Sequence, residues 1–178
     1  RLPSWRRRLY HEVDLLLPNS NAEAAQLIRY FGVPAHRIHV VPNGADPRFA
    51  GADAEPFCRL VGCRDYVLCC GRIEPRKNQL GLLRALRGAG TDVVVLGDPV
   101  PGHEPYDHAC LHAADENVRF VGWLAHDDPR LASAYAASGC VALTGWYETP
   151  GLVALEAAMQ GVPLVLPHGG CAREYFGS

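Results

Sequence analysis

The chain has 178 residues, 48% of them hydrophobic, so it can bury one substantial core and is expected to hold one domain with part of a second. Charged residues make up 20% of the chain and the formal net charge is -2, which excludes a whole-protein field that would attract nucleic acid. No signal peptide is evident at the start and no apolar stretch is long enough to span a membrane, which predicts a soluble, cytoplasmic protein.

The first part of the chain has the pattern of a connector. The residues Asn19-Ser20-Asn21 are good N-caps for a helix, and the run 42–47 is rich in turn-forming residues. Residues 48–64 show no clear periodicity and are interpreted as a loop or short linker. Two short strands and one helix are expected before them, at 14–17, 38–41 and 22–31.

From Asp65 onward, short apolar runs alternate with longer amphipathic stretches, which is the pattern of repeated strand-helix units. The runs are almost continuously hydrophobic, as in strands of a parallel sheet covered by helices on both faces. The predicted class is therefore α/β, with a doubly wound, Rossmann-like parallel sheet. Strands are expected at 66–70, 92–96, 118–121, 140–143 and 163–166, and helices at 78–86, 131–137 and 151–160.

The seven cysteines are an odd number, and Cys69 and Cys70 lie within an apolar run, which indicates small buried residues in a reducing compartment rather than a disulfide framework. Cys58 and Cys63 have no matching second pair for a zinc site. The segment 103–112 carries three histidines and a cysteine, but its spacing fits no strong metal template. A solvated loop leading into a short helix is favoured there, with a metal site as the alternative.

Two cations follow the first strand of the predicted sheet. Gly71-Arg72 comes directly after that strand and Lys77 precedes the next helix, so both should project from the carboxyl end of the sheet, where ligands bind in open α/β folds. A guanidinium fork and a compact ammonium could together neutralise a diphosphate leaving group. Ordinary solvated loop cations are the alternative interpretation.

The segment 148–156 follows the fourth strand and opens a helix. The amides of Gly151 and Leu152 are expected to be free donors at the positive end of the helix dipole. Glu148 precedes the helix and Glu156 lies about two turns along it, roughly 12 Å away, a reach that fits a long, hydroxyl-rich ligand. Glu148 as a dipole partner and Glu156 as a surface residue are the alternative, which the apolar neighbours of Glu156 disfavour.

The same segment, with its Gly-Leu-Val-Ala-Leu-Glu core and the following Gly161-Val162-Pro163, closely resembles the donor-site motif of retaining glycosyltransferase family 4, which has the GT-B fold. The resemblance covers about residues 14–176. Thr149-Pro150 departs from the pattern, since the family often has a small residue and an aromatic there. Three further segments resemble the family's landmarks in the same order: Pro42-Asn43-Gly44-Ala45-Asp46, Gly71-Arg72-Ile73-Glu74-Pro75-Arg76-Lys77-Asn78 and Val118-Arg119-Phe120-Val121-Gly122.

The resemblance implies that the parent enzyme transfers a hexose from a nucleoside diphosphate sugar to a glycan or lipid-linked acceptor with retained configuration, without a metal or another cofactor. It implies that Arg72 and Lys77 hold the donor diphosphate, Glu156 the ribose hydroxyls, and Glu148 the hydroxyls of the transferred sugar. Arg72, Lys77 and Glu148 are the implied catalytic residues. The other implied donor-site residues are Gly71, Gly151 and Leu152, together with Gly122, Trp123 and Leu124 near the base, where Trp123 either stacks or packs.

The resemblance also implies a division of the chain. Residues 1–47 would be the end of an acceptor domain and the connector, and 48–178 a nucleotide-sugar-binding domain that lacks the family's final helices. The missing acceptor domain would be the partner of this part. The chain by itself is then expected to bind the donor without transferring its sugar.

Two other functions remain open at this point. One is a non-catalytic nucleotide-sugar-binding or partner-binding module of the same fold. The other is an unrelated α/β enzyme such as a sugar-nucleotide epimerase, which is disfavoured because no Gly-x-Gly-x-x-Gly follows a predicted strand. The basic and aromatic segment 5–10 also leaves open a weak peripheral contact with the inner membrane face, although an ordinary solvated helix face is favoured.

Overall fold

The computed structural model describes residues 4–149 and 151–177, with side chains from Arg7 onward. The chain divides into two compact units. The larger unit comprises Ala45–Tyr147 and Gly151–Pro167. The smaller unit comprises the described parts of Arg1–Gly44, Glu148–Pro150 and His168–Ser178. The chain therefore passes from the smaller unit to the larger one at Gly44–Ala45 and returns twice.

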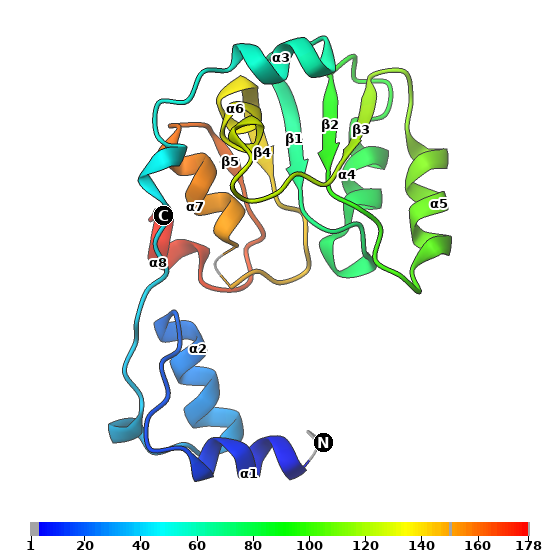
Figure 1. Cartoon of the computed structure of the whole chain (residues 1–178). Helices are drawn as coiled ribbons and strands as arrows, with labels where there is room; N and C mark the ends of the chain where they lie inside the picture. Colours follow the sequence, from blue (N-terminus) through cyan, green and yellow to red (C-terminus); the bar gives the residue numbers. More distant parts are fainter. Residues whose placement is uncertain (1–3, 150, 178) are drawn as a thin grey trace. The chain divides into compact units, whose positions relative to one another are not determined.

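A five-stranded parallel sheet forms the centre of the larger unit, with strand order β3-β2-β1-β4-β5 (Figure 1). All five predicted strands are confirmed, with small shifts at their ends. They are β1 (Tyr66–Cys70), β2 (Val93–Leu96), β3 (Val118–Gly122), β4 (Ser138–Ala142) and β5 (Leu164–Val165).

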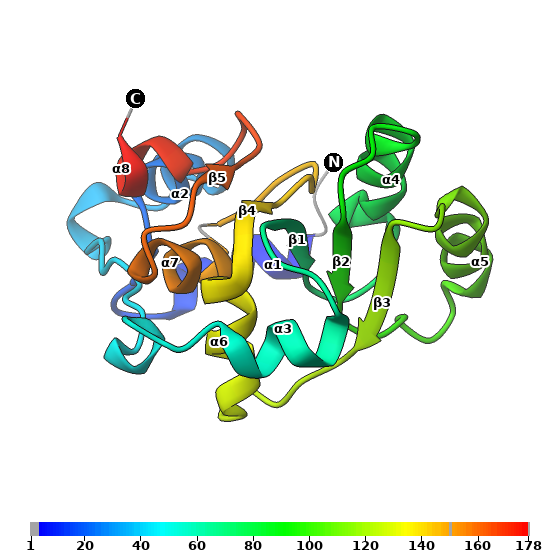
Figure 2. The same cartoon turned by 90° about the horizontal axis from the view of Figure 1, so that it is seen from above.

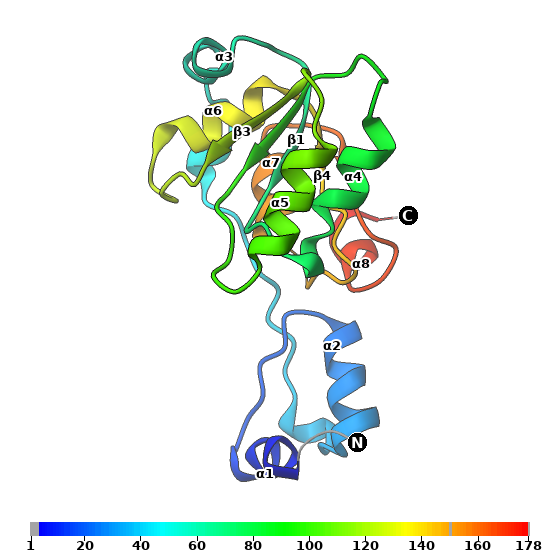
Figure 3. The same ribbon diagram turned by 90° about the vertical axis from the view of Figure 1, so that its right-hand side faces the viewer.

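Helices cover both faces of this sheet, as Figure 2 and Figure 3 show. On one face, Val93 and Val95 of β2 pack against Leu83 and Cys110. On the other, the hydroxyl of Tyr66 in β1 donates to the carbonyl of Ala134 at 2.8 Å. The predicted doubly wound α/β class is therefore confirmed. The first face carries α4 (Gln79–Leu86) and α5 (Glu104–Ala113), and the second carries α3 (Glu55–Val61), α6 (Pro129–Ala137) and α7 (Leu152–Met159).

The interpretation of residues 48–64 as a loop or linker was wrong. That stretch contains most of the 3-10 turn η3 (Pro47–Phe49) and the whole of α3. Helix α3 is so short that its apolar face consists mainly of Phe57 and Val61, one turn apart and both buried. The amide of Phe57 donates to the hydroxyl of Ser133 at 3.0 Å, so packing on α6 stabilises a helix too short to show a clear period.

The smaller unit contains α1 (Ser4–Glu12), α2 (Asn21–Gln26), a π-helical turn η1 (Leu27–Phe31), a 3-10 turn η2 (Ala35–Arg37) and α8 (Ala172–Phe176). The helix predicted at 22–31 is confirmed, although its last turn widens to the π form. The two short strands predicted at 14–17 and 38–41 were wrong, because the pairing amounts to a single parallel bridge between Leu16 and Ile38.

In the described residues, no helix is both long and apolar enough to cross a membrane. All seven cysteines lie within the described part of the chain and are free thiols. In the segment 5–10, the side chains of Trp5 and Arg6 lie outside the described residues, while Arg7, Arg8 and Leu9 are exposed.

Candidate functional site

The strand order creates a switch point between β1 and β4, because the connection after β1 leads to one side of the sheet and the connection after β4 leads to the other. In such sheets, ligands bind in the crevice outside the carboxyl ends of the strands. The two loops that leave this point contact each other. The Thr144 hydroxyl after β4 lies 3.2 Å from the Lys77 carbonyl, and the amide of Trp146 donates to the carbonyl of Arg76 at 3.1 Å.

Glycines end the three neighbouring strands β1, β2 and β3. The amide of Gly71 donates to the carbonyl of Leu96 at 2.9 Å, and the amide of Gly97 donates to the carbonyl of Gly122 at 2.8 Å. All three glycines have a positive φ, at 142°, 148° and 82° in chain order. The backbone thus adopts a glycine-favouring conformation where each of the three strands ends.

A cavity of about 560 Å³ lies above these strand ends. Six of the residues predicted for the donor site line it, namely Gly71, Arg72, Trp123, Leu124, Leu152 and Glu156. Its remaining lining is mostly apolar, so an occupant would contact few polar groups, and their placement would decide its orientation. That lining is Cys70, Leu96, Gly97, Asp98, Pro99, Val100, Pro101, His126, Leu131, Tyr135 and Val153.

The two predicted diphosphate cations border the same glycine. Arg72 follows Gly71 directly, and a Cβ on Gly71 would lie 3.8 Å from Cε of Lys77, which is in the 3-10 turn η4 (Pro75–Lys77). The Arg72 side chain is 67% exposed and forms a 3.4 Å ion pair with Glu74. Because the guanidinium is mostly exposed and this pair is long, an anion entering the cavity could compete for Arg72.

Helix α7 begins at the cavity. Gly151 is its N-cap, with φ 49° and ψ 102°, and the first helical residues Leu152 and Val153 line the cavity. The first amides of a helix have no partner within the helix and carry partial positive charge. The cavity lining therefore combines the Arg72 cation, with Lys77 close to Gly71, and the first amides of α7, an arrangement that suits an anionic group.

Of the other predicted residues, Gly122 borders the cavity through its neighbour Trp123. Glu148 belongs to the smaller unit, where it is 9% exposed and its backbone forms a parallel bridge with Gly170. Of the dipeptide Thr149-Pro150, which departs from the family motif, Pro150 lies outside the described residues.

Glu156 is the buried acid of the cavity, at 5% exposed. It lies in α7, and its two oxygens have different partners. The Tyr135 hydroxyl donates to Oε2 at 2.7 Å, and Nε2 of His126 lies 2.9 Å from Oε1. Burial raises the pKa of the Tyr135 phenol, and the nearby Cys70 thiol and Glu156 carboxylate raise it further, so the hydroxyl stays protonated.

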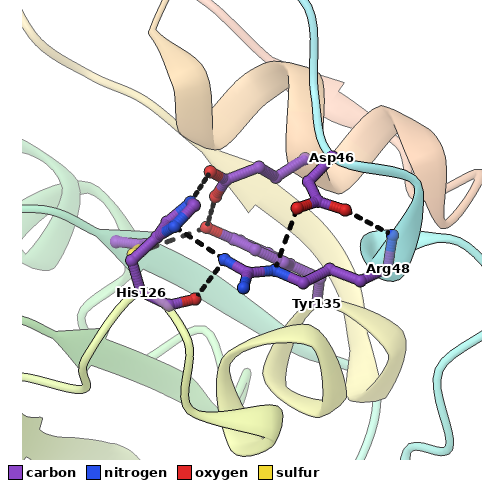
Figure 4. A network of polar contacts seen from close by, with 6 residues as sticks. Asp46, Arg48, His126 and Tyr135 are labelled. Carbon is purple, nitrogen blue, oxygen red and sulfur yellow. Dashed lines mark hydrogen bonds and ion pairs between the residues drawn. The ribbon is translucent and has the colours of Figure 1, made fainter.

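The contacts of Glu156 continue through His126 to Arg48 and Asp46 (Figure 4). Nη2 of Arg48 lies 2.6 Å from Nδ1 of His126 and donates to the His126 carbonyl, also at 2.6 Å. Arg48 lies 3.8 Å from the Asp46 carboxylate, and its guanidinium lies 5.0 Å from the ring centre of Phe49. Glu156 is therefore one end of a chain of polar contacts that begins at the turn η3.

The sequence interpretation missed His126, Tyr135 and Arg48. One available signal was the tyrosine within an apolar helix, since a buried hydroxyl needs a hydrogen-bond partner. The identity of that partner was not readable, because Glu156 lies on a different helix, 21 residues further along.

Among the described residues, no group of three or more His, Cys, Asp or Glu side chains could hold a metal ion. The segment 103–112, which was the metal candidate, forms most of α5. Its Cys110 is fully buried in the core with Leu83 and Val95. The predicted short helix at this position is thus present, and the cysteine packs against the sheet.

Two family models match successive parts of the chain. The family "Glycosyl transferases group 1" matches residues 60–178, and "Glycosyltransferase Family 4" matches residues 1–49. The D-inositol 3-phosphate glycosyltransferase of Rhodococcus opacus (strain B4) is 33% identical over 175 residues, which cover 89% of this chain and 39% of that protein.

Solved structures share the fold. A crystal structure of Anabaena Alr3699/HepE in complex with UDP is 26% identical with a TM-score of 0.77, covering 91% of this chain and 47% of that one. A glycosyltransferase from Rickettsia africae ESF-5 is 15% identical with a TM-score of 0.80, covering 100% of this chain and 52% of that one. The chain thus spans about two fifths of its curated relative and about half of these structures.

Proposed function

Because the chain belongs to the glycosyl transferases group 1 family, we propose that its larger unit binds the nucleoside diphosphate part of a sugar donor. The family assigned from the sequence motifs is confirmed. The fold is confirmed as well, since the five-stranded parallel sheet matches the C-terminal domain of GT-B glycosyltransferases.

The observation that carries this proposal is the composition of the cavity at the strand ends. Its lining includes Arg72, with Lys77 beside Gly71, and the N-terminus of α7. The same lining includes the buried carboxylate of Glu156, which accepts hydrogen bonds. A nucleoside diphosphate has matching groups, because its phosphates are anionic and its ribose carries two neighbouring hydroxyls that donate.

The chemistry of transfer assigns a role to the cations and to the carboxylates. When the bond between the anomeric carbon and the diphosphate oxygen breaks, both electrons leave with the diphosphate, so negative charge grows there. Arg72 and Lys77 stabilise that charge, as fixed cations do most effectively where charge develops in the transition state. Glu156 holds the ribose, and Glu148 contacts hydroxyls of the transferred sugar.

We propose uridine as the base to test first, because the Anabaena relative was crystallised with UDP. Trp123 is 67% exposed at the cavity and offers an aromatic face to a base. The whole enzyme is proposed to transfer a hexose to a glycan or lipid-linked acceptor with retained configuration. In this proposal residues 1–47 belong to the acceptor domain and the connector, and the 178-residue chain binds donor without transferring sugar.

Calorimetric titration of the chain with UDP, GDP and ADP tests the proposal. We expect saturable binding of at least one of them, and weaker binding after Arg72→Ala. Arg84→Ala is the matched control, since Arg84 is an exposed arginine of α4 that does not line the cavity. If a folded chain binds none of the three diphosphates, the proposed function is wrong.

A further inference from the structure

We propose that His126 and Tyr135 are positioning residues, which hold the carboxylate of Glu156 in the orientation that binds the ribose hydroxyls of the donor. This inference rests on the proposed function, because it takes the ribose to be the partner of Glu156. Neither residue belongs to the motifs that identified the family, and both line the cavity together with Glu156.

The first step concerns the free acceptor positions of Glu156. A carboxylate has about four of them, two on each oxygen. Tyr135 uses one on Oε2 and His126 uses one on Oε1, at 2.7 and 2.9 Å. One position on each oxygen is left for a ligand, and a ribose supplies two neighbouring hydroxyls. Two donors, one from each side, also prevent the carboxylate from rotating away from the cavity.

The second step concerns the proton on His126. The guanidinium of Arg48 has only donors, so Nδ1 of His126, 2.6 Å from Nη2, must accept. In the neutral imidazole the remaining proton is then on Nε2, which donates to Glu156. Arg48 therefore sets the tautomer of His126, and the carbonyl of His126, the Asp46 carboxylate and the Phe49 ring hold Arg48 in place.

The third step concerns Tyr135. Its ring is fully buried and lies edge-on to Phe49, with centroids 5.8 Å apart. Its hydroxyl is oriented between Glu156 and Cys70, whose Sγ is 3.9 Å away. Because the phenol stays protonated, it is a permanent donor to the carboxylate. Tyr135 thus donates from a fully buried position, and His126 donates from an exposed position where Arg48 orients its ring. Donors fixed in this way are what a preorganised binding site uses.

The experiment compares UDP with 2′,3′-dideoxy-UDP, which lacks both ribose hydroxyls. The unsubstituted chain is expected to prefer UDP. Tyr135→Phe and His126→Ala should each lower the affinity for UDP by about 3- to 15-fold and leave the affinity for the dideoxy compound within about twofold. In His126→Gln, the amide nitrogen can reach the position of Nε2, so most of the preference for UDP should return.

Tyr66→Phe is the matched control, because it also removes a hydroxyl from a fully buried tyrosine, but one that does not line the cavity. Tyr66→Phe should change the affinity for neither UDP nor dideoxy-UDP. That result would show that losing a buried tyrosine hydroxyl does not by itself weaken binding. Thermal unfolding of each variant accompanies the titrations. If Tyr135→Phe does not fold, the His126 variants keep the test open, since that side chain is 63% exposed.

The outcomes separate this inference from the proposed function. If the unsubstituted chain binds no nucleoside diphosphate, the proposed function fails and the inference fails with it. If it binds UDP and dideoxy-UDP equally, the contact between Glu156 and ribose is wrong, and so is the inference. If it prefers UDP and the variants keep the full preference, or lose both ligands equally, the positioning role alone is wrong.

Discussion

A Cβ on Gly97, after β2, would overlap the carbonyl oxygen of Gly71, after β1. Gly97 also has φ 148°, in a region that is essentially restricted to glycine. We expect Gly97→Ala to lower the free energy of unfolding by more than the roughly 1–2 kcal/mol that a positive φ costs an alanine. It should also weaken UDP binding, because the overlap displaces Gly71 and the adjoining Arg72.

Urea unfolding of Gly97→Ala measures the change in the free energy of unfolding, and titration with UDP measures the change in affinity. Gly88→Ala is the control, since Gly88 has φ 72° but a Cβ there would meet open space. It should be less destabilising and leave UDP affinity unchanged. Equal stability losses in the two variants would contradict the role of the close approach between Gly97 and Gly71.

Arg72 and Lys77 are expected to bind the phosphates and not the nucleoside. Arg72→Ala and Lys77→Ala should each weaken UDP binding by roughly 10- to 150-fold, the value of a hydrogen bond to a charged group. Binding of uridine, which has no phosphate, should change little. Titration of both ligands checks this, and a comparable loss for uridine would show that the cations act by maintaining the cavity.

The two glutamates are expected to serve different parts of the donor. Glu156→Ala should weaken UDP and UDP-sugar alike, by roughly 10- to 150-fold, because both carry the ribose. Glu148→Ala should weaken only the UDP-sugar, and its effect on UDP should be small or slightly favourable, since a carboxylate repels phosphates. Calorimetry of both variants with both ligands measures the difference, and circular dichroism checks folding. Equal losses for UDP would refute the assigned roles.

Binding of UDP is expected to persist in excess EDTA. Arg72, Lys77 and the first amides of α7 supply the positive potential that a metal ion would otherwise provide. The measurement is a titration of the chain with UDP before and after exhaustive treatment with chelator. A strict dependence on magnesium or manganese would overturn this expectation.

Glu174 of α8 caps the first turn of α2, where its oxygens accept from the amides of Asn21 and Ala22, both at 2.7 Å. Desolvation raises the pKa of Glu174, but the hydrogen bonds from Ala22 and Asn21 outweigh it and hold that pKa below its ordinary value. A lowered folded-state pKa means that the stabilisation is complete above the unfolded pKa of about 4.3 and is lost as the pH falls through the folded value.

Glu174→Gln should therefore lower the free energy of unfolding at pH 7 by about 0.5–1 kcal/mol, and the difference should shrink below pH 4. Urea unfolding at pH 7 and pH 3 tests this, with Glu116→Gln, an exposed residue of the larger unit, as the control. A difference that stays constant between the two pH values would show that charge on Glu174 is not the cause.

Local patterns in the sequence determined the sheet and the position of its ligand-binding edge. The strands around Cys70 and Leu96 are apolar on both faces, which is typical of a parallel sheet covered by helices on both sides. The order of the motifs determined the family. Local patterns did not predict the short helix α3, because its buried face is mainly Phe57 and Val61 and its stability depends on packing against α6.

Only the tertiary structure decided what surrounds Glu156. The sequence indicated that this acid is not an ordinary surface residue, since its neighbours in the helix are apolar. Its partners Tyr135 and His126 lie on other segments, and Arg48, which contacts His126, precedes it by 78 residues. Strand periods and helix caps depend on neighbours along the chain, whereas a buried hydrogen-bond network depends on how separate segments pack, which no local pattern records.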